Sequence, residues 1–416
     1  MSKIFYRVDI TTTSPLSIGN GEDQYTDNDV LVDDDGNPFI PGTTIAGVLS
    51  SVLDDESRNA LFSSGADIKD EDRKMSRVIT YDAYCNNNPV IGKRDNVRLD
   101  ENKTQVKGGK FDYQIIENGA EFKLLFELNG LSDDNIAIFE SLIQSMKLEQ
   151  ISFGHKTTRG FGRFHVDHVA KKEFCQSDFE EYLNFDVFNW DGEEYIIEND
   201  SSACLFKELD VELEQNGTLC IREYNPDPDG PDYMSITNGN CYCIPGTSWA
   251  GAFRSHITVL LKDLVHEDHF TYDKASSVIR QMFGYTDEND SLKSKISFSE
   301  TILNGARSLR VDRVKIDRFT SGAVDSAKLD EVVVVNGSGT LRISINSRFR
   351  MINPAIALLM LALEDLNDGM LCVGGETSIG RGMFTVKNLE ELKKQFDMKT
   401  CFDELAFLIR ECRKGV

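Results

Sequence analysis

The sequence predicts an α+β protein that consists of two tandem copies of one module. Three observations lead to this prediction: two short glycine-containing motifs each occur twice, they occur in the same order, and a helix-like segment precedes the second motif in both halves. The segments between the motifs also correspond. Four matched landmarks in one order indicate a duplication, so each copy is expected to form the same strands and helices.

Each copy opens with an alternating apolar and polar segment, at residues 5–10 and again at residues 209–213. Such alternation is typical of a strand with one buried face. The elements that follow in each half are compatible with a split β-α-β, ferredoxin-like core that carries a long insertion in its middle. The predicted domains are residues 1–170 for the first module, 171–204 for a linker, 205–390 for the second module and 391–416 for a C-terminal helical tail.

The first motif is Ile-Pro-Gly-Thr, at residues 40–43 and again at residues 244–247. Proline fixes φ and glycine permits a positive φ, so the motif predicts a sharp turn. Thr43 and Thr247 are expected to cap the helix that follows, and a helix start can offer N–H groups to a phosphate. A plain turn with a capping threonine is the alternative for either copy taken alone.

The second motif is a glycine loop, at residues 154–164 and 374–384. Glycines at matched positions would let the backbone approach a bulky ligand, and positive side chains beside them suggest phosphate as that ligand. The glycines are Gly160, Gly162, Gly380 and Gly382, and the nearby positive or titratable residues are His155, Lys156, Arg159, Arg163 and Arg381. Either loop alone is a weak signal.

A helix is predicted before each glycine loop. Ser132 with Asp133 and Asp134 behind it predicts one helix start, and Asn353 with Pro354 predicts the other. The longest apolar run, at residues 355–363, is too short to span a bilayer and is expected to be a buried helix face.

The middle of the second half holds a basic ribbon at residues 307–318, which includes Arg313 and Arg318. Val311, Val314 and Ile316 lie between the charged residues, so we expect an apolar underside. A solvated strand face is the alternative. The counterpart of this ribbon in the first half carries Arg94, Arg98, Lys103, Lys107 and Lys110, and the Phe111-Asp112 pair that follows there corresponds to Leu329-Asp330.

The composition and the net charge exclude some classes of function. Of 416 residues, 40% are hydrophobic and 27% are charged, which is a globular composition. The net charge of −24 argues against a free-standing, nonspecific nucleic-acid binder, so we expect the acidic residues on the outer face. Charges among the first ten residues indicate no signal peptide, and we expect a cytoplasmic protein without a membrane segment. Its nine cysteines are then expected to be reduced.

Together these motifs resemble the repeat-associated mysterious proteins (RAMPs), the superfamily of CRISPR effector subunits. The resemblance rests on Pro-Gly-Thr-Thr-x-Ala-Gly at residues 41–47, on the segment at residues 317–323, and on Thr-x-x-Gly-x-Gly-x-Phe in both loops. Within the superfamily the match is to backbone subunits of type III complexes. The family usually has lysine where Ala46 and Ala250 stand, and its frequent arginine after the helix start is present as Arg254 but is Ser50 in the first module.

The resemblance implies RRM-like palms that hold guide RNA, thumb-like insertions, and cleavage of complementary target RNA at regular intervals. It implies other CRISPR effector subunits as partners. The residue that promotes cleavage would be an aspartate before the short strand that leads to Pro-Gly, which is Asp27 in the first module. Asp232 is the match in the second module, one residue away from the expected position. An ordinary acidic loop is the alternative for Asp27.

The expected cofactor is Mg²⁺ or another divalent cation, although no ligand motif indicates one. His165 with His168, and His266 with His269, could each be half of a zinc site, but no four-ligand set is present. Two other functions stay open: a subunit that binds guide RNA or caps the complex without cutting, and an endonuclease that processes guide RNA. Two complete glycine loops argue against the processing enzyme.

Overall fold

The computed structural model describes residues 3–21, 25–62, 75–99, 105–197, 205–224, 230–231, 233–265, 275–287 and 290–413. The chain divides into two compact units. Unit 1 comprises Met1–Arg94, Phe111–Thr157 and Phe161–Leu205, and unit 2 comprises Asp95–Lys110, Thr158–Gly160 and Phe206–Val416. The domain boundaries expected from the sequence remain predictions.

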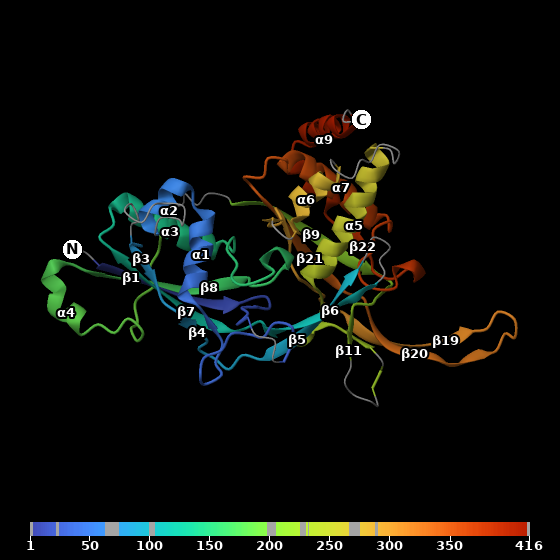
Figure 1. Cartoon of the computed structure of the whole chain (residues 1–416), viewed down its shortest axis with the longest axis horizontal. Helices are drawn as coiled ribbons and strands as arrows, with labels where there is room; N and C mark the ends of the chain where they lie inside the picture. Colours follow the sequence, from blue (N-terminus) through green and yellow to red (C-terminus); the bar gives the residue numbers. More distant parts are fainter. Residues whose placement is uncertain are drawn as a thin grey trace. The chain divides into compact units, whose positions relative to one another are not determined.

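Unit 1 contains a four-stranded antiparallel sheet in the order β3-β7-β1-β8. Its strands are β1 (Lys3–Thr12), β3 (Val78–Thr80), β7 (Glu121–Asn129) and β8 (Phe164–Phe174). Helices α1 (Gly42–Val52), α2 (Asp55–Leu61) and α3 (Asp133–Lys147) cover one face of this sheet (Figure 1). Ile4, Tyr6 and Val8 point into that core, as the alternation of the sequence predicts.

The remaining elements of the first half are short, apart from one hairpin. They are β2 (Phe39–Ile40), β4 (Ala83–Tyr84), the hairpin of β5 (Ile91–Leu99) and β6 (Gln105–Ile116), and α4 (Phe179–Leu183), with 3-10 turns at Thr157–Arg159 and Gln176–Asp178.

Unit 2 repeats this architecture. Strands β9 (Phe206–Asn216), β17 (Ile296–Phe298), β21 (Ser338–Asn346) and β22 (Met383–Val386) pair in the order β17-β21-β9-β22. Counted by their place in the module, both sheets have the order second, third, first, fourth. Helices α5 (Gly246–Val265) and α7 (Ile352–Asn367) lie on one face (Figure 1). The ferredoxin-like α+β fold expected from the sequence is therefore confirmed in both halves.

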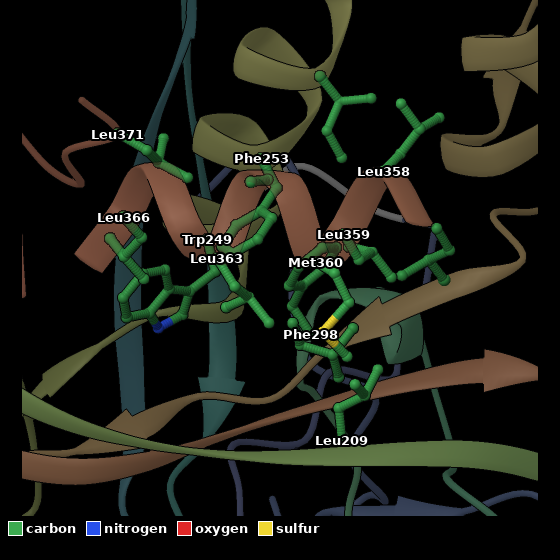
Figure 2. Packing of buried hydrophobic residues seen from close by; sticks show 14 of the residues in the cluster. Leu209, Trp249, Phe253, Phe298, Leu358, Leu359, Met360, Leu363, Leu366 and Leu371 are labelled. Atoms are coloured by element: carbon green, nitrogen blue, oxygen red, sulfur yellow. The ribbon is translucent and has the colours of Figure 1, made fainter. Parts of the chain in front are cut away.

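The core of unit 2 lies between α5, α7 and the sheet, where Trp249 and Phe253 meet Leu359 and Leu363 (Figure 2). The apolar run at residues 355–363 is buried as expected, with only Leu361 partly exposed. The start of α7 differs from the expectation: the helix begins at Ile352, so the Asn353-Pro354 pair lies inside its first turn.

The insertion of unit 2 is a long hairpin of β19 (Arg307–Ile316) and β20 (Ala323–Val335), which projects from the unit (Figure 1). Its expected apolar underside is buried only in part: Val311 is half-buried, whereas Val314 is 46% exposed and Ile316 is 56% exposed. Phe319, in the turn, is 97% exposed. The sequence pattern identified the strand but not the environment of its apolar face.

Smaller elements complete unit 2. They are β10 (Thr218–Leu219), β11 (Arg222–Tyr224), β12 (Tyr233–Ser235), β13 (Thr237–Asn238), β14 (Cys241–Ile244), α6 (Ala275–Phe283), β15 (Tyr285–Thr286), β16 (Ser291–Leu292), β18 (Thr301–Ile302), a 3-10 turn at Thr377–Ile379, α8 (Leu389–Lys394) and α9 (Met398–Arg413). The cysteines within the described ranges are free thiols. No helix in the described part of the chain combines the length and the apolar character that a membrane crossing requires.

Candidate nucleic-acid interface

The Pro-Gly-Thr motif starts a helix in both units, but not in the way the sequence suggested. Gly42 and Gly246 are the first helical residues and neither has a positive φ. A Cβ at Gly42 would lie 2.4 Å from the carbonyl oxygen of Thr80, and a Cβ at Gly246 would lie 2.4 Å from that of Phe298. Glycine is needed here because the helix start packs against the backbone of the second strand.

The two threonines of the motif are not caps. Thr43 lies exposed in the first turn of α1, and Thr247 is half-buried in the first turn of α5. The N-cap position of α1 is Pro41, which makes no side-chain capping bond. The Gly42 N–H donates to Asp82 Oδ1 at 2.7 Å. A carboxylate of the chain itself therefore occupies a helix start that was expected to be open to phosphate.

The two glycine loops have the same backbone geometry. A Cβ at Gly162 would lie 1.8 Å from the carbonyl oxygen of Phe153, and a Cβ at Gly382 would lie 1.9 Å from that of Val373. Both glycines have positive φ, +71° and +75°. Their N–H groups donate to equivalent carbonyls of the two units at 2.8 Å. These two glycines allow the loop to close on its own chain rather than on a ligand, which corrects the interpretation of their sequence pattern.

The other two loop glycines differ in their surroundings. Gly160, with φ +87°, is buried. Gly380, with φ +82°, is exposed, and a Cβ placed on it would meet no atom within 4 Å. Both glycines need the left-handed conformation, but only Gly380 has the open surroundings that a bulky ligand would require.

The first loop places its lysine on an aromatic surface. Lys156 adopts a left-handed φ of 57°, and its ammonium lies 2.9 Å from the ring centroid of Tyr113 and 5.2 Å from that of Phe111. The ring of Phe161 also packs against Tyr113, in an edge-on arrangement with the two ring centroids 5.9 Å apart. His155, the residue before Lys156, is exposed, and its backbone N–H donates to the Ser17 carbonyl at 2.7 Å.

The backbone register identifies the equivalent positions in unit 2. Leu16 pairs with Ile116 as Leu219 pairs with Val334, so Tyr113 and Glu331, each three residues earlier, are equivalent. The match of the two loops likewise makes Lys156 equivalent to Glu376 and Phe161 equivalent to Arg381. Glu376 has a left-handed φ of 58°, as Lys156 has.

The equivalent cluster in unit 2 is an ion-pair network. Glu331 is fully buried and its carboxylate lies 2.7 Å from Arg381, 2.9 Å from Arg313 and 3.2 Å from Arg222. Glu376 pairs with the same three arginines. Arg313 and Arg381, both expected to contact RNA, are thus paired with carboxylates from elsewhere in the chain.

The network also contains the one group among the described residues whose atoms lie close enough to share a metal ion, within 4.8 Å of one another: Cys220, Glu331 and Glu376. Three guanidinium groups already neutralise its carboxylates, so a divalent cation would meet repulsion there. His165 and His168 belong to no such group, and His266 and His269 lie outside the described residues.

Asp27 is exposed in the loop before the short strand that leads to Pro-Gly. Its Oδ2 accepts the N–H of Asp112 on β6 at 2.9 Å, and its own N–H donates to Asp112 Oδ1 at 3.1 Å. Asp29, two residues on, is 4% exposed and accepts the N–H groups of Tyr25 and Thr26. Within this acidic loop, Asp29 stabilises the turn and Asp27 presents a carboxylate to solvent.

Asp232 lies outside the described residues. The register around it is nevertheless informative, because Leu31 donates to Ile18 as Ile236 donates to Ile221. Four residues before Leu31 is Asp27, and four residues before Ile236 is Asp232. The mismatch of one residue in the sequence comparison therefore arises after this point, between the short strand and Pro-Gly.

The remaining basic candidates are distributed differently. Arg163 is half-buried, and its backbone N–H donates to Ser14 Oγ at 2.9 Å. Arg318 is exposed in the turn of the β19–β20 hairpin. Partial burial and the positive charges of Arg159 and Arg280 hold the pKa of Arg254 below its ordinary value. Repulsion among arginines is relieved when a phosphate binds between them.

The sheet faces opposite α1–α3 in unit 1 and opposite α5 and α7 in unit 2 differ in their side chains. In unit 1 the ring of Phe5 meets those of Phe185 and Tyr182, at 4.8 and 6.5 Å between centroids, so residues after β8 cover that face. In unit 2 the outward residues of β9 are acidic, and Asp210, Glu212 and Glu214 are all exposed. This acidic row agrees with the expectation that negative charge lies on an outer face, although Asp210 pairs with Arg342 and Glu214 pairs with Lys387.

Sequence reasoning missed Asp112, Glu331 and Glu376. The Phe111-Asp112 and Leu329-Asp330 pairs were noticed as landmarks of the repeat, which was the available signal for Asp112. Nothing in the sequence pairs Glu331 with Glu376, because they meet only through the fold.

Comparison with known proteins gives a family. The model of the RAMP superfamily matches residues 9–165 and again residues 233–385, which together are more than half of the chain. None of the curated proteins compared with the chain matches it. RAMP proteins work with RNA and other subunits in CRISPR complexes. The chain belongs to the RAMP superfamily, with two modules of that superfamily in tandem.

Proposed function

We propose that this chain is a guide-RNA-binding double backbone subunit of a type III CRISPR effector complex, and that it cleaves complementary target RNA at regular intervals. The observation that carries the proposal is the exposed carboxylate of Asp27, which accepts a hydrogen bond from the Asp112 N–H on β6, at the base of the first insertion. A second cleavage residue is supported by the sequence spacing, since Asp232 stands four residues before Ile236 as Asp27 stands four residues before Leu31.

The chemistry requires little of the protein. RNA carries its own nucleophile, the 2′-hydroxyl, and cleavage needs this oxygen in line with the phosphorus and the leaving oxygen. A carboxylate at the site can accept the hydroxyl proton. Because the Asp112 N–H binds Oδ2 of Asp27, the orientation of that carboxylate is fixed before RNA arrives.

A divalent cation such as Mg²⁺ is part of the proposal. The Asp27 carboxylate is exposed and offers the hard oxygen donors that Mg²⁺ prefers, whereas the Asp112 carboxylate is already paired with Lys93, so Asp27 is the residue that would hold the ion. When bound there, Mg²⁺ would supply charge stabilisation to the phosphate. For guide binding, the proposal relies on the loop residues His155 and Lys156 and on the arginines around Arg254.

A second candidate function is a subunit that binds guide RNA or caps the complex without cutting. The ion-pair network of unit 2 favours it, because Glu331 and Glu376 neutralise Arg313 and Arg381 and leave less positive charge for phosphate. In that case the ion pairs would stabilise unit 2, and unit 2 would take no part in cleavage.

The test uses the complex reconstituted with guide RNA and a matched, end-labelled target in Mg²⁺. Asp27→Asn preserves the shape of the side chain and removes its charge, and it should abolish one subset of cuts without weakening target binding. Asp34→Asn, at another exposed aspartate near this loop, is the matched control and should leave every cut in place. Asp232→Asn should remove a different subset. An unchanged cleavage pattern in both the Asp27 and the Asp232 variants would refute these residues as the cleavage residues, and a wild-type complex that binds the target without cutting it would establish the non-cutting function instead.

A further inference from the structure

Asp27 and Asp112 hold each other by both backbone and side chain. Each donates its N–H to a carboxylate oxygen of the other, at 3.1 and 2.9 Å, although they lie 85 residues apart in the sequence. Two such bonds restrain the position of the Asp27 backbone as well as the rotation of its carboxylate. Asp112, on β6, therefore contributes directly to the placement of the proposed cleavage residue.

The contact continues along the strand. Gln114 donates its N–H to the Asn28 carbonyl at 3.0 Å, and its side-chain oxygen accepts the Val30 N–H at 3.0 Å. The Asp27 loop is thus attached to β6 over several residues. Within this attachment, Asp112 is the residue that touches the Asp27 carboxylate itself.

Lys93, on β5, forms an ion pair with the Asp112 carboxylate. Two aspartates at hydrogen-bonding distance would otherwise repel each other, and the ammonium group offsets that repulsion. The Asp112 side chain is 25% exposed, so its charge is only partly screened by water.

The same residue type recurs at the equivalent position of unit 2. Counting four residues back from Ile116 and from Val334, which hold equivalent positions in the register, gives Asp112 and Asp330. Asp330 is also paired with a cation of the neighbouring strand, because Arg310 Nε donates to its Oδ1 at 2.9 Å. An aspartate with a cationic partner thus stands at the base of both insertions.

We propose that Asp112 is a positioning residue for Asp27, so that the strand at the base of the insertion sets the geometry of the cleavage site. This inference rests on the proposed function. Asp112 acts through the placement of Asp27, by its Oδ1 acceptor and its backbone N–H. Its negative charge is not required for that role.

Two substitutions separate position from charge. Asp112→Asn keeps the Oδ1 acceptor at the same place and removes the charge. Asp112→Glu keeps the charge and moves the acceptor outward by one methylene. Misplacement of a reacting group by about 1 Å can cost about 100-fold in rate. We therefore expect single-turnover cleavage at the Asp27-dependent position to fall about 10- to 100-fold in Asp112→Glu and by less than about threefold in Asp112→Asn.

The measurement is made on the complete complex with matched target, together with target affinity and the thermal unfolding temperature of each variant. Both variants should bind target as the wild-type complex does. A loss in Asp112→Asn that equals or exceeds the loss in Asp112→Glu would show that the charge matters and would overturn the inference. Full activity in both variants would overturn it as well. If Asp27→Asn itself cleaves normally, the proposed function fails, and the two failures are therefore distinguishable.

Discussion

Glu331→Gln is the substitution whose effect on stability can be worked out most fully. The Glu331 side chain is fully buried, and its carboxylate lies within 3.2 Å of three guanidinium groups, those of Arg222, Arg313 and Arg381. Glutamine has nearly the same volume, so packing is preserved. The change removes one of the two carboxylates that neutralise the three arginines.

The magnitude depends on how far each arginine can reach water. Arg381 has a side chain that is 6% exposed, so it would remain as a buried, incompletely paired charge, and breaking a buried pair costs about 3–5 kcal/mol. Arg222 and Arg313 are each 33% exposed, and each such contact contributes only about 0–1 kcal/mol because water screens it. We therefore expect a total loss of about 3–5 kcal/mol in the free energy of unfolding of unit 2.

The assay is urea unfolding at pH 7, followed by tryptophan fluorescence. The chain has two tryptophans, and Trp190→Phe leaves Trp249, which is buried in the core of unit 2, as the reporter. The control is Glu390→Gln, whose side chain is 75% exposed beside Lys393 and whose substitution should leave the free energy of unfolding unchanged. A loss below about 1 kcal/mol in Glu331→Gln would refute the reasoning, since the arginines would then be hydrated without their partner.

The effect should also depend on pH. Burial raises the pKa of the Glu331 carboxyl, but the hydrogen bond from Arg381 and the charges of the three arginines outweigh it, so the pKa lies below the ordinary value of 4.5. For a depressed pKa the stabilisation is fully present above the pKa of the unfolded chain and is lost as the pH falls through the pKa of the folded state. The difference in the free energy of unfolding between wild type and Glu331→Gln should therefore become smaller below about pH 4.5.

Three further predictions concern unit 2 and are checked by the same urea titration. Gly382→Ala places a Cβ 1.9 Å from the Val373 carbonyl oxygen at a positive φ, and should cost at least about 2–3 kcal/mol or prevent folding. Gly251→Ala in α5, where a Cβ meets no atom within 4 Å, should instead stabilise the unit by about 0.5–1 kcal/mol, and a loss there would contradict this account of the glycines. Thr301→Val removes the acceptor of the buried Trp249 Nε1–H, 3.0 Å away, and should cost about 1–3 kcal/mol; an unchanged stability would mean that the indole N–H has another partner.

The fold was predictable because its signals are local and occur twice. Alternation identified β1 and β9, and the two repeated motifs enclose the same set of elements in each half. The role of the glycines was not predictable. A glycine required by a positive φ, as at Gly162, and one required by a close neighbouring backbone, as at Gly42, look the same in a sequence. Only the fold shows which strand lies against each of them.

The candidate site was predictable only in part, because burial and pairing depend on residues distant in the sequence. Asp27 and Asp29 stand in one acidic loop, and the structure exposes the first and buries the second. In the sequence Arg313 and Arg381 resemble phosphate ligands, but in the fold both form ion pairs with Glu331. A basic residue indicates an RNA contact only if the fold leaves its charge unpaired.

The two modules have kept one backbone while their side chains have diverged, and this difference bears on which module does more of the RNA binding. The equivalent positions that hold Lys156 and Tyr113 in unit 1 hold Glu376 and Glu331 in unit 2, with the same left-handed φ at the loop residue. Cation–π contact leaves the charge of a lysine intact, whereas an ion pair neutralises an arginine. Because affinity for RNA follows the number of phosphates that a protein neutralises, charge-removing substitutions in the loop of unit 1 should weaken RNA binding and its salt dependence more than those in unit 2. The same reasoning favours Asp27 as the stronger of the two cleavage candidates, since the guide would be held most firmly beside it.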